Sequence, residues 1–311
     1  MQPKVVASAR KILSIKGREG YALKPSKVDP HKRRWRRIGS MASMQTRRDT
    51  RGRGSVLPPD WLTRWPERRR FEDFSDFERG GLGRDGPVTV GRLGAERWVL
   101  KPSDEAVANE IIASVVGRSL GLLVPPAMAV DKGDEIWAAS LRVPALRHDP
   151  RVGFNDRNPF RFGPEGPEDI PNYWQQVGLG KLLGDIDRKG GNWGLDQYGR
   201  RWDFDFSLSD HANFFLAPDT PEWNHYRKDR FKGDIESMRI RGLSSSALQR
   251  FLEPYRTLAE SDPEKLYGWV SGVGDLGGLF MGKKPLGPSL IEAGHANRKA
   301  VGEVLRELGV H

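Results

Sequence analysis

The sequence contains no cysteine among its 311 residues. This absence excludes a disulfide framework, a thiolate nucleophile, a cysteine-ligated zinc site and an iron–sulfur cluster. Long apolar runs are also missing: none approaches the roughly 18 residues that a membrane-spanning helix requires. The opening residues, MQPKVVASAR, lack the continuous apolar segment of a secretory signal. We therefore expect a cytoplasmic protein without a membrane span, long enough for one large domain or two lobes.

Acidic residues are scarce in only one part of the chain. The net charge is +10, and residues 1–70 contain 20 of the 51 Lys+Arg but only 5 of the 41 Asp+Glu. Segments such as HKRRWRR hold too few apolar side chains to offset the entropy lost on ordering, so residues 1–56 are expected to form a flexible basic arm. This arm could bind nucleic acid or an acidic partner by counterion release. It could equally be a solvated tail, an extension before a start at Met41 or Met44, or an Arg-rich transit peptide.

Three familiar classes of enzyme site lack their required context. Gly117-Arg-Ser119-Leu-Gly121 matches the G-x-S-x-G elbow of α/β-hydrolases, but helical spacing precedes the serine and Leu-Leu-Val-Pro-Pro follows it, the reverse of the strand-then-helix context that the elbow needs. The six histidines form no His-Glu-x-x-His motif. The glycine-rich stretch 271–284 lacks the Gly-Lys-Ser/Thr ending of a Walker loop. These observations argue against a hydrolase, a zinc enzyme and a P-loop NTPase.

The apolar pattern changes from strands in the first half of the chain to helices in the second. The spacing predicts two strands over 88–101, joined through Gly91-x-x-Gly94, and a helix from Ser103 to Gly121. Further strands are expected at 127–130 and 135–144, and helices at 173–183, 244–255, from a capping box at 261–264, and at 289–308. Residues 147–172 are polar and aperiodic. We therefore predict an α+β, two-lobed protein, with the arm at 1–56, a small β-rich N-lobe at 57–146 and a mainly helical C-lobe at 147–311.

The segment DRKGGN, from Asp187 to Asn192, combines residues that suit phosphoryl transfer. That reaction needs a base near the acceptor hydroxyl and oxygen ligands for magnesium beside the phosphates. A short loop can present Asp187 to the hydroxyl while Asn192 turns back to the metal. An antiparallel strand pair would bring Asp205 to the same place, with Asp203, two residues earlier on the same strand face, as the fallback ligand. The two strands are expected at 193–195 and 201–205.

These elements resemble the atypical kinases related to HipA and, more distantly, the phosphatidylinositol kinases. Those families carry an Asp-x-x-x-x-Asn catalytic loop followed by a strand that ends in a metal-binding Asp. DRKGGN corresponds to the loop and WDFDFSLS resembles the strand, with Phe206 where His or Asn is common and Ser207 where Gly is common. The resemblance covers roughly residues 86–215. It implies a two-lobed protein-kinase-like fold that binds ATP and Mg²⁺.

The resemblance also implies roles for residues upstream of the loop. Lys101 takes the position of the lysine that binds the phosphates, and Glu110, on the following helix, takes that of its carboxylate partner. In the same families Asp187 aligns or deprotonates the acceptor, and Asn192 and Asp205 hold the metal. The residues that would contact the nucleotide are Gly91, Gly94, Lys101, Leu141 and Val143.

Each of these residues also has a plain structural interpretation: Asp187 and Asn192 form turns readily, Lys101 suits a surface, and Glu110 suits an exposed helix face. Their common order along the chain favours an ATP- and Mg²⁺-dependent kinase that transfers the γ-phosphoryl group to a hydroxyl, with a protein Ser or Thr favoured over a lipid. The alternative is a catalytically silent nucleotide-binding or scaffold protein that holds nucleic acid or an acidic partner through residues 1–56. The residues at 206 and 207 leave room for it.

Overall fold

The structure is a computed structural model, and it describes residues 61, 64, 66–83, 86–102, 104–208, 212–270 and 285–310. The chain divides into two compact units, Met1–Ser40 and Met41–His311. All described residues belong to the second unit. The predicted basic arm of residues 1–56, the expected helix cap at Ser103 and the glycine-rich stretch 271–284 lie outside the described residues.

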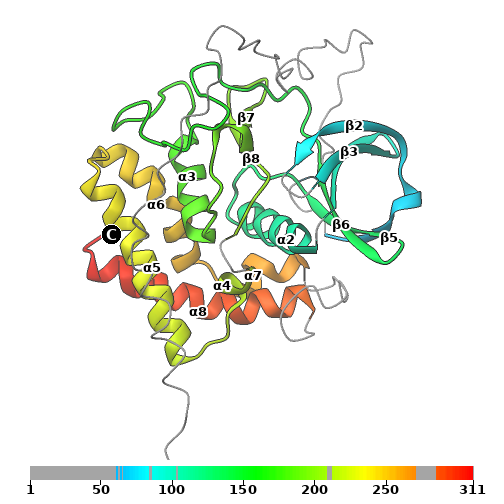
Figure 1. The fold of residues 1–311 in the computed structure, drawn as a ribbon. Coiled ribbons are helices and arrows are strands. Elements are labelled where there is room, and N and C mark those ends of the chain that lie inside the picture. Colours follow the sequence, from blue (N-terminus) through cyan, green and yellow to red (C-terminus); the bar gives the residue numbers. More distant parts are fainter. Residues whose placement is uncertain are drawn as a thin grey trace, which may run out of the picture. The chain divides into compact units, whose positions relative to one another are not determined.

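Six strands form one sheet in the order β1-β5-β6-β4-β3-β2 (Figure 1). Their bounds are β1 Arg68–Arg70, β2 Ser75–Gly83, β3 Gly86–Leu93, β4 Glu96–Pro102, β5 Ala127–Lys132 and β6 Glu135–Leu141. β1 and β5 run parallel, and the other neighbours are antiparallel. The strands expected at 127–130 and 135–144 are thus confirmed. Because β4 is paired on both sides, its backbone gives the side chains of this strand fixed positions.

The predicted hairpin of β3 and β4 is present, but its turn differs from the expectation. The two strands pair with Leu93 opposite Glu96. Gly94 lies in the turn with a φ of 59°, a conformation that glycine adopts without strain. Gly91 instead lies inside β3, where an added Cβ would be 3.0 Å from the ring of Phe77. The glycine at 91 therefore allows close packing against β2 and is not part of the turn.

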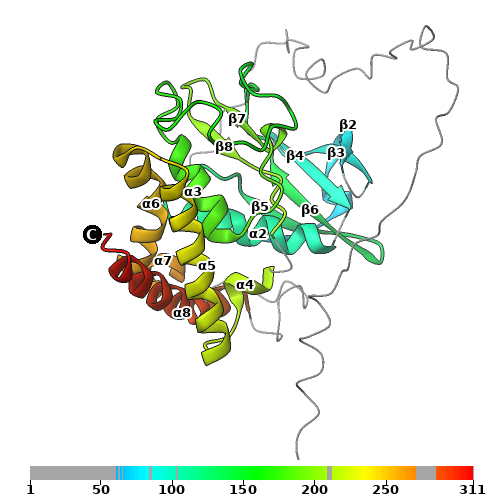
Figure 2. The ribbon, with the colours of Figure 1, turned by 60° about the vertical axis from the view of Figure 1, so that its left-hand side comes forward.

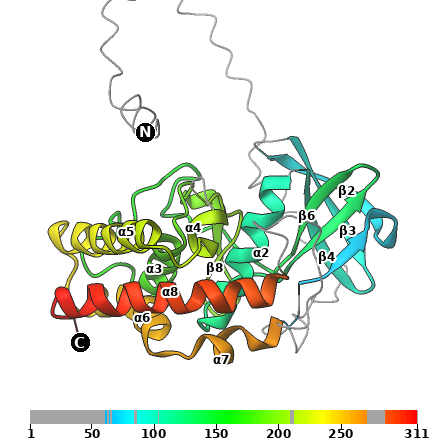
Figure 3. The same cartoon turned by 90° about the horizontal axis from the view of Figure 1, so that it is seen from below.

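The helix predicted between residues 103 and 121 is α2 (Asp104–Ser119), which packs against β5 and β6. Its apolar residues at helical spacing are buried, among them Val107, Ile111, Ile112, Val115 and Val116. Figures 1 and 3 show α2 between the sheet and the helices of the second half. Ser119 is the last residue of this helix, and its hydroxyl accepts a hydrogen bond from Trp269 Nε1 at 2.9 Å. A helix and not a strand precedes this serine, so the hydrolase elbow is absent.

The second half of the chain consists of helices around one large core (Figure 2). Their bounds are α3 Tyr173–Leu183, α4 Ala212–Leu216, α5 Pro221–Ile240, α6 Ser245–Glu260, α7 Pro263–Tyr267 and α8 Leu286–Glu307. α3 has the predicted bounds, and α6 and α8 confirm two further predicted helices. α8 runs past α5, α6 and α7 (Figure 3). In the described ranges, no helix is both long and apolar enough to cross a membrane.

Two helix starts differ from the sequence prediction. α7 is capped by Asp262, whose carboxylate accepts a hydrogen bond from the Glu264 backbone N–H, and not by the expected residue 261. α5 was not predicted, although Thr220 caps it and Pro221 occupies its first turn. The helix was missed because its sequence has only a narrow apolar stripe. Of its 20 residues, four are buried: Arg227, Phe231, Ile235 and Met238.

Residues 142–172 form turns without a regular helix, in agreement with the aperiodic sequence. The chain then passes through α3 to a two-stranded sheet, β7 (Trp193–Leu195) and β8 (Arg201–Asp203). These strands pair antiparallel, with Trp193 opposite Asp203. The expected strand pair is thus confirmed. It lies between the DRKGGN loop and the residues that follow β8.

Gly178 of α3 tests the packing beneath this loop. A Cβ at this position would clash with the backbone carbonyl oxygen of Phe251 on α6. We expect Gly178→Ala to lower the free energy of unfolding by about 1 to 3 kcal/mol, as overpacking does, even though alanine favours a helix by about 1 kcal/mol. Gly302→Ala on α8 is the matched control, because a Cβ there meets nothing within 4 Å. Urea denaturation should show that this control is stabilised; stabilisation of both variants would contradict the packing of α3 on α6.

Candidate active site

Lys101 of β4 lies between two carboxylates that come from different parts of the chain. Its Nζ forms an ion pair with Glu110 Oε1 of α2, and a second with Asp205 Oδ1 at 2.8 Å. Glu110 is only 4% exposed, and its other oxygen accepts a hydrogen bond from the Ser140 hydroxyl at 3.2 Å. The plain interpretations of a surface lysine and an exposed glutamate are therefore wrong. The sheet, α2 and the segment after β8 meet at this ammonium group.

The charges of this cluster shift one another's protonation. Burial disfavours the charged ammonium, but the attraction of Glu110 and Asp205 outweighs it and raises the pKa of Lys101. Burial also raises the pKa of Glu110, against the opposing effect of the lysine. Lys101 is thus a fixed cation at neutral pH, suited to binding an anionic group.

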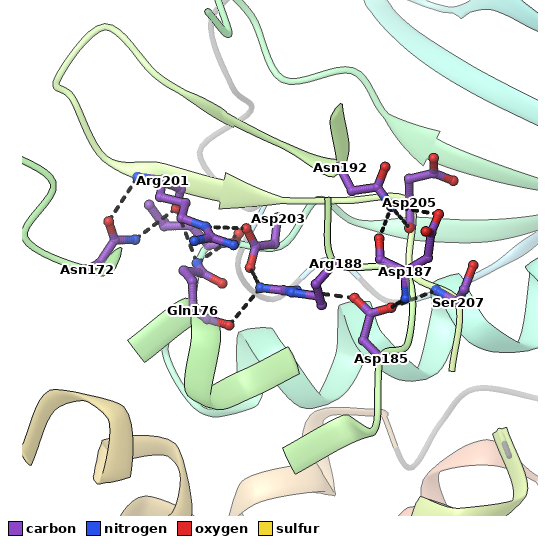
Figure 4. Close-up of polar contacts among 11 residues, drawn as sticks. Asn172, Gln176, Asp185, Asp187, Arg188, Asn192, Arg201, Asp203, Asp205 and Ser207 are labelled. Carbon is purple, nitrogen blue, oxygen red and sulfur yellow. Dashed lines mark hydrogen bonds and ion pairs between the residues drawn. The ribbon is translucent and has the colours of Figure 1, made fainter. Parts of the chain in front are cut away.

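The DRKGGN loop follows α3 after residues 184–186. Gly184 has a φ of 76° and terminates the helix in a left-handed conformation. The side chain of Asn192 then folds back over the loop: its amide nitrogen donates to the backbone oxygens of Asp187, at 2.7 Å, and Asp205, at 3.0 Å (Figure 4). The amide oxygen of Asn192 accepts no hydrogen bond from the described residues. Asn192 therefore joins the loop to the Asp205 segment and leaves one oxygen ligand uncommitted.

Asp205 follows β8 and has an unusual backbone conformation. Its φ is 59°, in the left-handed region that non-glycine residues rarely adopt. Such a conformation costs free energy and persists only where the surroundings impose it. Here Phe204 N donates to Asn192 O at 2.9 Å just before the turn, and Asp205 Oδ1 binds Lys101 just after it. Asp205 Oδ2 accepts no hydrogen bond from the described residues, and the side chain is half exposed.

Asp203, the fallback ligand, is not positioned to bind a metal. Its side chain is fully buried, one oxygen accepts a hydrogen bond from Arg201 Nε at 2.7 Å, and the other pairs with Arg188 Nη2 (Figure 4). It does not share a face with Asp205, because the left-handed turn at Asp205 ends the strand alternation that the fallback assumed. This correction leaves Asp205 as the carboxylate of the segment that faces Lys101.

Asp187 is bracketed by two cations. Oδ1 accepts a hydrogen bond from Arg157 Nη2 at 2.7 Å, and Oδ2 accepts one from Lys189 Nζ at 2.6 Å. The carboxylate is about a quarter exposed. It therefore lies at the protein surface, beside Asn192 and within reach of an incoming group.

The loop is held from outside by residues 153–157 of the aperiodic segment. Gly190 N donates to Asp156 O at 2.9 Å, and Gly191 N donates to Phe154 O at 2.7 Å. A Cβ at Gly191 would lie 2.5 Å from the ring of Phe154, and one at Gly190 would clash with a backbone oxygen of the same segment. The paired glycines of DRKGGN are therefore needed for the close approach of two backbones.

The residues expected to contact a nucleotide are only partly gathered near Lys101. Gly94 lies in the turn at the opposite end of β4, and Gly91 faces Leu100, on the other face of the sheet from the lysine. The structure therefore does not bring these two glycines to the site. Instead, the connection between β2 and β3, from the Gly80–Gly86 cluster, lies at the Lys101 end of the sheet; its residues 84 and 85 lie outside the described residues. Leu141 pairs with Trp98 and packs with Leu100 on that same far face, so the structure does not bring its side chain to the site either. Val143 is buried just after β6.

Comparison with known proteins begins with two negative results: the sequence matches no protein-family model and no curated protein. Among solved structures, the chain is similar to that of a Helicobacter pylori proinflammatory kinase, CtkA, with 14% identity, a TM-score of 0.52, and coverage of 78% of this chain and 99% of that chain. The fold is kinase-like. A second similarity, at 14% identity and a TM-score of 0.36, is to a chain of the Shewanella oneidensis MR-1 toxin–antitoxin system of HipA, HipB and operator DNA, and covers 73% of this chain and 62% of that chain.

Two residues of the candidate site were missed in the sequence although they lie in or beside DRKGGN. Asp185 Oδ1 accepts hydrogen bonds from the backbone N–H groups of Asp187, at 3.2 Å, and Ser207, at 3.1 Å. Arg188 lies between Asp185, at 3.3 Å, and Asp203. The only signal was the density of charge in Asp-Ile-Asp-Arg, which does not tell which carboxylate is buried. Arg157 had no local signal at all, because it reaches Asp187 from 30 residues away.

Asp185 gives the site a pH-dependent stability. Burial raises its pKa to about 6, against the effects of Arg188 and the two backbone donors. The folded state therefore binds the proton more tightly than the unfolded state, whose Asp pKa is about 3.9, so this group lowers stability as the pH rises from about 4 to about 6. Asp185→Asn removes the titrating group. The free energy of unfolding of the variant minus that of wild type should therefore increase by about 2 to 3 kcal/mol as the pH rises from 4 to 7.

Urea denaturation of both proteins at a series of pH values measures this difference. The test is how the free energy of unfolding changes with pH. Its absolute value is not informative, because Asp185→Asn also removes the attraction between residue 185 and Arg188, which shifts stability at every pH. Parallel pH profiles of wild type and variant would contradict the assignment of Asp185 as a buried carboxyl with a raised pKa.

Proposed function

We propose that the chain is an ATP- and Mg²⁺-dependent kinase related to HipA, which transfers the γ-phosphoryl group to a hydroxyl, most readily on a protein Ser or Thr. One observation carries the proposal: Lys101 pairs with both Glu110 and Asp205, while Asn192 ties Asp205 to the loop of Asp187. The proposal takes Lys101 as the cation for phosphate, Asn192 and Asp205 as the oxygen ligands for a metal, and Asp187 as the carboxylate base. In this proposal residues 57–146 form the nucleotide-binding lobe and residues 147–311 the second lobe.

The uncommitted oxygens near Lys101 suit magnesium. Asn192 Oδ1 and Asp205 Oδ2 are hard ligands without a partner among the described residues, and Mg²⁺ prefers such oxygens. In the described part of the chain, no three His, Cys, Asp or Glu side chains gather to hold a metal by themselves. This fits an ion that takes its remaining ligands from phosphates and water. Bound there, Mg²⁺ would neutralise the charge that develops on the phosphate oxygens.

The nucleotide contacts follow from the position of Lys101. We propose that Lys101 binds phosphate oxygens and that Glu110 keeps it oriented. The glycines of the β2–β3 connection, at the same end of the sheet, replace Gly91 and Gly94 as candidates for phosphate contact through backbone N–H groups. Val143, just after β6, stays the candidate for adenine contact, whereas the side chain of Leu141 packs on the far face of the sheet from Lys101.

The acceptor side is assigned to Asp187. The acceptor oxygen attacks the γ-phosphorus, the bond to the ADP oxygen breaks, and Asp187 takes the hydroxyl proton or aligns it for release. Most of the rate then comes from fixed charges and not from covalent chemistry of the protein.

One observation favours the alternative of a catalytically silent nucleotide-binding protein. Both oxygens of Asp187 are engaged by cations, so the base needs its partner Arg157 to move before it can accept a proton. In this alternative, residues 1–56 would hold nucleic acid or an acidic partner. Its support is the excess of basic residues in that part of the sequence.

The two functions separate in a phosphoryl-transfer experiment with γ-labelled ATP, Mg²⁺ and a generic protein acceptor. Wild type should transfer label, whereas Asp187→Ala and Asp205→Ala should each lose it by at least a hundredfold, because each removes a group that acts on the transition state. Asp229→Ala, which removes an exposed carboxylate of α5, is the matched control and should retain transfer.

Wild-type transfer by the Asp187→Ala or Asp205→Ala protein would contradict the site assignment. Magnesium-dependent ATP binding by wild type without transfer to protein or to phosphatidylinositol would favour the silent protein. Absence of ATP binding would contradict both functions.

A further inference from the structure

Among the arginines of residues 149–172, Arg157 is the one whose ion pair lies outside this segment. Arg151 pairs with Asp149 and Asp169. Arg161 pairs with Asp156. Arg157 instead reaches across to Asp187 Oδ1 and is 64% exposed, so most of its donors face solvent. It is a cation placed directly on the residue that the proposed mechanism gives to the acceptor.

Two exposed apolar side chains belong to the segments that meet at this carboxylate. Phe154 is 49% exposed and Ile186, the residue before Asp187, is 60% exposed. Few large apolar residues of the described ranges are this open to solvent. Exposed apolar residues beside polar ones mark interaction surfaces more often than isolated ones do. Phe154, Arg157 and Ile186 together form what is here called the acceptor surface.

The acceptor surface is held rigidly against the catalytic loop. The backbone oxygens of Phe154 and Asp156 accept hydrogen bonds from Gly191 and Gly190, so the segment that carries Arg157 cannot shift without breaking them. The ring of Phe154 lies on Gly191, where any side chain would displace it. Fixed elements of this kind define where a second molecule can lie relative to Asp187.

We propose that the acceptor surface binds a polypeptide in which the acceptor Ser or Thr is followed by an acidic side chain and has an apolar side chain next to it. Arg157 would leave Asp187 to pair with the acidic side chain, which frees the carboxylate for the hydroxyl. The apolar side chain would pack on Phe154 and Ile186. This assignment rests on the proposed function, because it takes Asp187 as the acceptor-side residue.

The charges favour a peptide over an anionic membrane. Membrane surfaces attract clusters of several basic residues, each contributing about 1 kcal/mol. Here the neighbouring Arg151 and Arg161 are neutralised by carboxylates of their own loop, which leaves Arg157 and Lys189 as the cations beside Asp187, too few for a membrane-binding cluster. Arg157, the more exposed of the two, matches an acidic side chain, and such complementarity chooses between partners more than it adds affinity.

The test is peptide binding by the full-length chain, which does not require phosphoryl transfer. The probes are two fluorescent peptides with a central serine and a neighbouring leucine, one with two glutamates after the serine and one with two lysines there. Fluorescence anisotropy at low salt, where such charge pairs are least screened, gives both affinities. The variants are Arg157→Gln and Arg157→Glu. Arg70→Glu, on the exposed edge strand β1, is the matched control for the same change of charge.

We expect wild type to prefer the glutamate peptide by about twofold to fivefold, the range for exposed charge pairs. Arg157→Gln should abolish this preference and Arg157→Glu should reverse it in favour of the lysine peptide. The Arg70→Glu control should keep the wild-type preference. Local unfolding would weaken the binding of both peptides alike, so it cannot produce a reversal of the preference.

Equal preferences of wild type and Arg157→Glu would overturn the proposal, as would a wild-type protein that does not distinguish the two peptides. Arg157-dependent binding to phosphatidylinositol vesicles in place of the peptides would also overturn it and point to a lipid acceptor. A protein that shows the predicted reversal but transfers no label would refute the proposed kinase activity and leave the acceptor surface as a peptide-binding site. The two failures are therefore distinguishable.

Discussion

The guanidinium of Arg188 lies in the interior between the carboxylates of Asp185 and Asp203, and the geometry of the candidate site depends on it. Removing one member of such a cluster leaves an uncompensated buried charge, which is far more destabilising than the intact cluster is stabilising. Asp185 holds the backbone of Asp187 and of Ser207, and Asp203 ends β8. One partly buried cation between two buried carboxylates therefore holds both the loop and the strand that carry the site residues.

The second organising contact is the ammonium of Lys101. It joins three parts of the chain that are separate in sequence: β4, α2 through Glu110, and the segment after β8 through Asp205. Both the strained φ of Asp205 and the buried charge of Glu110 cost free energy, and such costs are typical of functional sites. In the proposed function, a nucleotide phosphate and a metal would compete with the ion pair between Lys101 and Asp205, and one set of charges would replace the other.

The sequence predicted those features that depend on local spacing. α2, α3 and the strand pairs could be read because apolar periodicity and turn residues are local signals, and the order of Lys101, Glu110 and the DRKGGN loop was recognised by resemblance. Asp203 was wrong as the fallback metal ligand because the left-handed conformation of Asp205 ends the alternation of the strand. No sequence pattern predicts that conformation. The contact of Arg157 could not be predicted, because an aperiodic segment does not indicate which of its side chains point in the same direction. The glycine turn was misplaced since either of two glycines fits a hairpin.

The measurement that tests the account most directly is ATP binding by titration calorimetry with and without Mg²⁺, on wild type and on Asp205→Asn. The account predicts that Mg²⁺ strengthens ATP binding to wild type by about tenfold or more, as expected for a metal held between phosphates and the protein. The Asp205→Asn protein should bind ATP with little dependence on Mg²⁺. Wild-type affinity that is the same with and without Mg²⁺, or a variant that keeps the full dependence, would contradict the central claim.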